Sequence, residues 1–87
     1  MLKTIYSRQS QLLRERIVNA RQNAGFTQRD LAARLGRERS FIARIELGER
    51  RVDLAEFYWI CKACGVSAET TAADLMRKFA RLDKAVH

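Results

Sequence analysis

The chain has 87 residues, of which 47% are apolar, and its 17 Lys and Arg against 10 Asp and Glu give a formal net charge of +7. A chain this short buries only about 60–65% of its unfolded surface, so it supports a single domain, 1–87, with one core. No run approaches the ~18–20 apolar residues that cross a bilayer, and the N-terminus lacks an apolar signal core, so we expect a cytoplasmic protein with no membrane contact.

The first predicted helix begins near Ser7 to Ser10 and continues to Ala24, where Gly25 stops it. Residues 1–9 have too little helical periodicity to assign, and we treat them as an N-terminal arm that is either ordered across the domain or disordered. Its apolar residues are Leu2, Ile5 and Tyr6, and the inner stripe of the helix is Leu13, Ile17, Ala20 and Ala24.

Two short helices joined by a tight turn are predicted between residues 27 and 51. Thr27 caps the first helix, and Asp30, three residues later, completes a variant of the capping box. Gly36 ends this helix because it accepts a left-handed backbone. The second helix ends at Gly48. Inward faces are expected from Leu31, Ala32 and Leu35 in the first helix and from Ile42 and Ile45 in the second, with Arg39, Ser40, Ala43 and Arg44 on the other side.

A fourth helix follows, with Asp53 and Glu56 as a capping box. Tyr58 and Trp59 lie outside its apolar stripe, and we expect cover from elsewhere in the chain, with a second subunit as the alternative. Its inner face is predicted to be Leu54, Phe57, Ile60, Cys61 and Cys64. Cys61 and Cys64 are the only cysteines, and without further ligands they predict two reduced core residues rather than a zinc site or a disulfide.

The segment 67–87 predicts a long C-terminal helix that reaches about Lys84, with Ser67 or Thr71 as its cap. Its amphipathic stripe consists of Ala72, Leu75, Met76, Phe79 and Leu82. Pro is absent and all four glycines fall at suspected helix ends, which is typical of a compact all-α fold.

These elements resemble the helix-turn-helix of the phage repressor and Cro family, the xenobiotic-response-element-like regulators. The resemblance covers a core of residues 10–66. It is carried by Thr27-Gln28, Leu31-Ala32, Leu35-Gly36, Ile42, Glu46 and Gly48, with Arg21 upstream and residues 54–66 downstream. It implies a five-helix lambda-repressor-like domain with an extended C-terminal helix. It also implies a structural ion pair between Arg21 and Glu46, which fixes the angle between elements more than it stabilises the fold.

The resemblance further implies how the chain meets double-stranded DNA. The second helix of the motif enters the major groove, and Arg39, Ser40 and Arg44 match the positions that contact bases. Arginine pairs well with guanine O6 and N7, so a guanine-rich half-site is expected. The residues expected to contact the DNA backbone are Gln28, Arg37, Arg50 and Arg51. Eight arginines against four acids between residues 21 and 51 place the excess charge in this motif.

Three residues depart from the family pattern, and they put the operator sequence in doubt rather than the fold. Glu38 stands where a hydroxyl residue often caps the recognition helix; it can accept from cytosine N4 or repel a phosphate. Phe41 replaces a small polar residue; it either touches a thymine methyl or packs, and we favour packing. Leu47 replaces a polar residue, so one phosphate contact is expected to be missing.

The leading hypothesis is a sequence-specific transcriptional regulator, repressor-like, that binds a palindromic operator as a homodimer. The alternative is an antitoxin-type interaction protein whose C-terminal helix binds a partner protein, while the helix-turn-helix autoregulates its own promoter. An enzyme is disfavoured because the single histidine, His87, is terminal and no catalytic triad, metal cluster or phosphate loop is present. No cofactor is expected.

Overall fold

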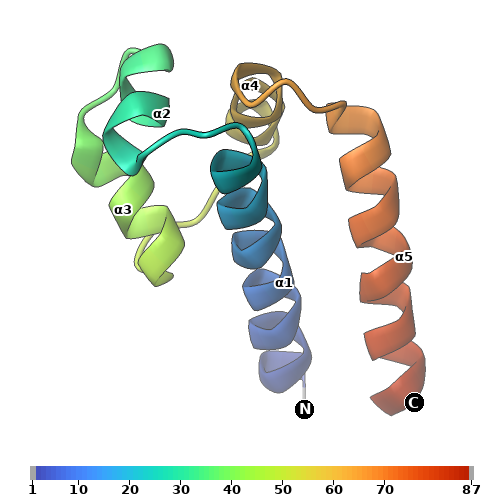
Figure 1. Ribbon diagram of the computed structural model, residues 1–87. Coiled ribbons are helices and arrows are strands. Elements are labelled where there is room, and N and C mark those ends of the chain that lie inside the picture. Colours follow the sequence, from blue (N-terminus) through green and yellow to red (C-terminus); the bar gives the residue numbers. More distant parts are fainter. Residues whose placement is uncertain (1, 87) are drawn as a thin grey trace.

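The computed structural model describes the backbone of residues 2–86 and the side chains of residues 7–84. Within that range the chain forms five α-helices and no strand (Figure 1). The predicted all-α class is therefore confirmed. In chain order the helices are α1 (Leu2–Asn23), α2 (Gln28–Arg34), α3 (Arg39–Leu47), α4 (Leu54–Ala63) and α5 (Ala68–Val86).

The central element is α1, which contacts α3, α4 and α5. Figure 1 shows α2 and α3 together on one side of α1, while α5 lies alongside α1 on the other side and runs antiparallel to it. The start of α1 and the end of α5 are consequently at the same end of the molecule. The helix-turn-helix formed by α2 and α3 thus packs against α1, and α1 in turn packs against α5.

Reciprocal side-chain caps fix where α2 and α4 begin. The Thr27 hydroxyl accepts from the Asp30 amide at 3.0 Å, and the Asp30 carboxylate accepts from the Thr27 amide at 2.9 Å. Asp53 and Glu56 form the same arrangement ahead of α4. Each cap satisfies amides that have no partner within the helix, and a cap of this kind contributes about 1 kcal/mol. Both predicted capping boxes are confirmed.

The core lies where the inner faces of the helices meet. Its largest fully buried side chains are Ile17, Leu31, Ile42, Ile45 and Ile60. A second, smaller cluster of Phe57, Cys61 and Leu75 joins α4 to α5. Burying one large aliphatic side chain contributes about 1.5–3 kcal/mol, so these residues hold the two helices of the motif in place. The predicted inward faces of the motif are confirmed for Leu31, Ala32, Ile42 and Ile45.

The first helix begins at Leu2, earlier than the predicted start near Ser7 to Ser10. Most of the segment assigned to an arm is therefore helical. No glycine or proline interrupts residues 2–23, and α5 supplies a neighbour along the added turns, so helix continues without an obvious apolar stripe. The predicted packing of Leu2, Ile5 and Tyr6 concerns side chains outside those that the structure describes.

Two predictions about α4 are wrong. Leu54 was placed on the inner face, but it is 79% exposed because, as the first residue of α4, it lies a turn before the helix reaches the core. Tyr58 and Trp59 were expected to be covered within the chain, but they are 47% and 55% exposed. Their position follows from helical geometry, since Phe57, Ile60 and Cys61 take the buried side and turn the two aromatic rings outward.

The last helix is capped by Ser67, whose hydroxyl accepts from the Thr70 amide at 3.1 Å, so the cap is Ser67 rather than Thr71. Leu75 is buried as predicted. Met76, placed in the same stripe, is 60% exposed, and that prediction is wrong. One residue turns an α-helix by about 100°, which takes Met76 away from the side that contacts α1 and α4. No helix within the described residues has the length and apolarity needed to span a membrane.

Candidate nucleic-acid interface

The second helix of the motif, α3, presents a polar side because its apolar side is anchored in the core. Ile42 and Ile45 are fully buried. Arg39 and Arg44 are exposed and Ser40 is half-buried on the other side of the helix. The helical turn of about 3.6 residues brings these three predicted base-contacting residues onto one outward side. The structure thus places them together on the outward side of α3.

Arg21 and Glu46, which the resemblance pairs, form a bidentate ion pair between α1 and α3. Arg21 Nε donates to Glu46 Oε2 at 2.7 Å, and Nη2 donates to Oε1 at 3.1 Å. The two side chains are 12% and 9% exposed. Arg21 Nη1 also donates to the Phe26 carbonyl at 2.8 Å. The pair therefore ties α3 both to α1 and to the connection that leads into α2.

Gln28, predicted to contact the DNA backbone, joins this network. Its Nε2 donates to Glu46 Oε1 at 2.8 Å, so the amide group is held against α3 rather than free in solvent. An amide nitrogen carries two N–H groups, and one remains for a phosphate oxygen. Gln28 is also the first residue of α2, where backbone N–H groups point out of the helix.

A basic hollow opens between the N-terminal ends of α2 and α3. It encloses about 510 Å³ and is lined by Arg21, Thr27, Gln28, Arg29 and Arg39. Arg29 was not singled out from the sequence. Its place in the sequence could have predicted it, because Arg29 directly follows Gln28 in the first turn of α2, where it is exposed. Arg21 is already paired with Glu46, so Arg29 and Arg39 are the two arginines of this hollow that are suited to a phosphate group.

The loop after α3 is fixed by Arg50, a second predicted backbone contact. Arg50 Nη1 donates to Glu56 Oε1 at 2.9 Å and Nη2 donates to Oε2 at 2.7 Å. Nη1 also donates to the Arg51 carbonyl at 2.8 Å. Hydrogen bonds from Arg50 hold the pKa of Glu56 at about 2, below its usual 4.5. Arg50 therefore links the end of α3 to the first turn of α4.

Phe41 packs beneath this loop. Its ring is 5% exposed, and the guanidinium carbons of Arg37 and Arg50 lie 4.0 and 4.6 Å from its centroid. The packing alternative for Phe41 is therefore confirmed. Cation–π contacts of this kind contribute about 0.5–1 kcal/mol each near a surface. They also orient Arg37, one of the predicted backbone contacts, along the side of the motif.

The other two departures from the family pattern lie at the two ends of α3. Glu38 is the N-cap of α3, but its side chain makes no capping hydrogen bond and is exposed. Leu47 is 72% exposed at the last residue of the helix. Arg51 is exposed in the loop beyond, as a backbone contact requires. The carboxylate of Glu38 and the apolar side chain of Leu47 thus lie at either end of α3, on each side of its exposed arginines.

The cysteines belong to the core. Cys61 and Cys64 form no disulfide and are buried, and burial raises the pKa of each thiol. Within the described residues no group of three or more His, Cys, Asp or Glu side chains is placed to hold a metal ion.

A helix-turn-helix whose second helix exposes arginines, on a chain of net charge +7, defines a DNA-binding module. A family model described as "Helix-turn-helix domain" matches residues 12–73, and the chain belongs to this family. A solved structure of an XRE-family like protein from Pseudomonas syringae pv. tomato str. DC3000 is 39% identical, covers 88% of this chain and 94% of its own, and superimposes with a TM-score of 0.84. A comparison with curated proteins gave no match.

The resemblance to xenobiotic-response-element regulators is confirmed by this neighbour, as is the five-helix fold. The chain is accordingly a DNA-binding regulator of a family that is not a family of enzymes.

Proposed function

We propose that this chain is a repressor-like transcriptional regulator that binds a palindromic operator as a homodimer, with α3 in the major groove. The observation that carries the proposal is the outward side of α3, where Arg39, Ser40 and Arg44 stand opposite the buried Ile42 and Ile45. In this geometry Arg39 and Arg44 each pair with a guanine, and Ser40 contacts a neighbouring base. The cytoplasm is the proposed place of action.

The proposed backbone contacts flank α3. Gln28 and Arg29 hold one phosphate at the basic hollow, while Arg37 and Arg51 follow the strand at the other end of the motif. Arg50 keeps two N–H groups beyond its bonds to Glu56 and to the Arg51 carbonyl, and these can meet a phosphate. We assign Arg50 first to positioning the loop that carries Arg51.

A dimer is proposed because one domain of 10.1 kDa reads only a few base pairs. Two surfaces are candidates for the dimer contact, namely α4 with its preceding loop and the C-terminal helix with Phe79 and Leu82. Phe79 and Leu82 are half-buried, and Phe79 packs on the cluster shared by α4 and α5. Leu54 and Tyr58 are exposed one turn apart on α4. We therefore propose α4 as the dimer surface.

The antitoxin-type alternative requires a free apolar face on α5. The inner side of α5 is occupied by contacts with α1 and α4, and Met76 is the large apolar side chain that α5 leaves exposed among the described residues. This arrangement favours the regulator over the alternative.

Selection of bound sequences from random duplex DNA tests the proposal. We expect enrichment of an inverted repeat with guanine-containing half-sites about 10 bp apart. Light scattering on the selected duplex should then show two chains per site. Enrichment of no sequence at all would overturn the proposed specificity, and a tight complex with one chain on one half-site would overturn the dimer.

A further inference from the structure

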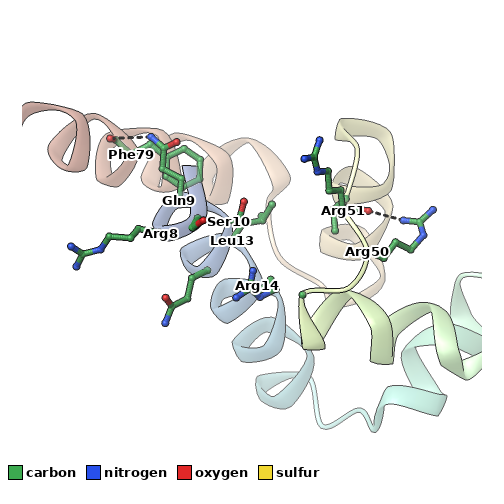
Figure 2. Close-up of a pocket in the computed structure, with 12 residues that line it drawn as sticks. Arg8, Gln9, Ser10, Leu13, Arg14, Arg50, Arg51 and Phe79 are labelled. Carbon is green, nitrogen blue, oxygen red and sulfur yellow. Dashed lines mark hydrogen bonds between the residues drawn. The ribbon is translucent and has the colours of Figure 1, made fainter. Parts of the chain in front are cut away.

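A groove separates the first half of α1 from the loop that follows α3, and α5 closes one end of it (Figure 2). It encloses about 900 Å³. The side chains around it are polar, basic or apolar, and none of them is acidic. Arg8 and Arg14 of α1 stand on one side, and Arg50 and Arg51 of the loop stand on the other. The groove is distinct from the outward side of α3 proposed to read DNA bases.

Arg14 is the basic residue that points into this groove. Its guanidinium lies against Gly48, and its carbon is 3.1 Å from the place that a Cβ at residue 48 would take. This is the C-terminal end of α3, where the helix dipole favours a positive charge. Among the described residues neither Arg14 nor Arg8 forms an ion pair. Figure 2 shows Arg8 extending outward from the far rim, where it is exposed.

The floor of the groove is apolar. Leu13, Val52 and Phe79 line it, and each is only half-buried, so each keeps apolar surface facing the groove. Gln9 Nε2 donates to the Phe79 carbonyl at 3.5 Å, which joins α1 to α5 at the closed end. The site therefore combines an apolar base with the positive charge of Arg14, which no acidic residue lining the groove neutralises.

We propose that this groove binds an acidic, amphipathic segment of a partner protein. Its apolar side chains would cover Leu13, Val52 and Phe79, and its carboxylates would bond to Arg14 and, at the rim, to Arg8. A phosphate backbone gains nothing from an apolar floor, and two of the three proposed base contacts, Arg39 and Ser40, lie at the other end of α3. A second copy of this chain is disfavoured as the occupant, because the α4 surface proposed for the dimer, with Leu54 and Tyr58, does not line this groove.

The probe for this site is a helix-forming peptide of about four turns, with glutamates on one face and leucine and phenylalanine on the other. Titrated into the isotopically labelled full chain, up to about 1 mM, it should shift backbone amides of residues 8–14 and 48–52 and of Phe79. A peptide with lysine for glutamate, and one with alanine for leucine and phenylalanine, should bind at least about tenfold more weakly.

Single substitutions test whether Arg14 supplies the positive charge that binds the peptide. Arg14→Gln should weaken peptide binding about tenfold, the effect of one charge-assisted hydrogen bond. Arg14→Lys should restore most of it. Arg77→Gln is the matched control, because Arg77 is on α5 outside the groove with a 63% exposed side chain, and it should change binding by less than about twofold. Thermal melts establish that each variant is folded.

Four results would overturn the proposal. They are no amide shifts at about 1 mM peptide, equal binding of the lysine or alanine peptide, equal effects of Arg14→Gln and Arg77→Gln, and displacement of the peptide by random-sequence duplex with shifts at the amides of residues 8–14 and of Phe79, which lie outside the proposed DNA contacts. The last result would assign the groove to DNA. Concentration-dependent shifts of these amides without peptide would assign it to a second copy. Operator selection tests the proposed regulator separately, so either proposal can fail alone.

Discussion

Arg50 and Glu56 lie six residues apart and join the end of the recognition helix to the start of α4. Their two parallel hydrogen bonds, of 2.9 and 2.7 Å, form beside the buried ring of Phe41. Glu56 also accepts from the amide of Asp53, so one carboxylate both caps α4 and holds the loop. The connection after α3 is therefore fixed by specific bonds, and α4 is oriented relative to the DNA-binding helix.

The first prediction concerns this pair. Glu56→Gln keeps the capping geometry but removes the charge, and it should lower the free energy of unfolding near neutral pH by about 1–2 kcal/mol, since both partners are partly exposed. The folded pKa of Glu56, about 2, lies below the usual 4.5. The carboxylate therefore stabilises the fold fully above about pH 5, and this contribution disappears as the pH falls toward about 2. Urea unfolding at a series of pH values measures it.

The control is Glu69→Gln, which removes a carboxylate from an exposed position on α5. The difference between wild type and the Glu56 variant should shrink at acid pH, whereas the control should leave stability near neutral pH unchanged within about 0.5 kcal/mol. Parallel pH curves for wild type and Glu56→Gln would contradict the proposed role of the pair.

The second prediction concerns Arg21 and Glu46, whose side chains are 12% and 9% exposed. Replacing either one by alanine strands the other charge and should cost ~3–5 kcal/mol. Replacing both should cost clearly less than the sum of the two single effects. A double-mutant cycle in urea measures the coupling. The exposed pair Gln11 and Glu15, one turn apart on α1, is the control and should couple by less than about 0.5 kcal/mol. Additive effects at Arg21 and Glu46 would contradict the buried network.

Much of the motif could be predicted from local signals. Thr27 and Asp53 predict where helices begin, because each forms capping hydrogen bonds with a residue three positions later. Gly36 and Gly48, with φ of 68° and 81°, mark the turns that need a left-handed backbone. The Arg21–Glu46 pair spans 25 residues, and only the family resemblance placed it.

The misses share a different cause. Helical periodicity gives the direction of a face, but neither its width nor the residue at which the core begins. Met76, at the edge of the apolar stripe of α5, and Leu54, at the first residue of α4, are therefore exposed although the pattern predicts them on the inner face. The bond from Arg50 to Glu56 depends on the loop path, which no periodic pattern encodes. Glu56 had also been assigned to a cap, and a carboxylate with two oxygens can serve both partners.

The third prediction addresses the dimer surface. Leu54→Glu, at the exposed start of α4, should leave the fold intact but place a charge inside the proposed interface, and should weaken operator binding at least about tenfold. Met76→Glu introduces the same charge at a similarly exposed apolar position on α5 and is the control. Light scattering on operator duplex should show one chain per site for the first variant and two for the second. The reverse pattern would place the interface on α5.

The fourth prediction concerns the two thiols. Burial raises the pKa of Cys61 and of Cys64, so at neutral pH both should react with a thiol-specific disulfide reagent far more slowly than in urea. Absorbance at increasing urea concentration follows the reaction. Rapid modification of the folded chain would contradict their place in the core.

The last prediction separates base contacts from backbone contacts, which leave different thermodynamic signatures. A guanidinium on a base edge carries sequence information, whereas one on a phosphate acts mainly by releasing counterions. Arg39→Ala should therefore cost ~1–3 kcal/mol on the operator and relax preference at one base pair per half-site, with little effect on random duplex. Arg44→Ala should behave in the same way.

Arg51→Ala should instead weaken operator and random duplex by similar factors, because a phosphate contact does not depend on sequence. It should lower the slope of log K against log salt by ~1 for each phosphate that the variant no longer binds, a change that Arg39→Ala should not reproduce. Binding isotherms at several salt concentrations, on operator and on scrambled duplex, distinguish the two roles. If Arg39→Ala and Arg51→Ala reduce affinity for both duplexes equally, α3 does not read bases through Arg39, and the outward side of α3 serves only as an electrostatic contact.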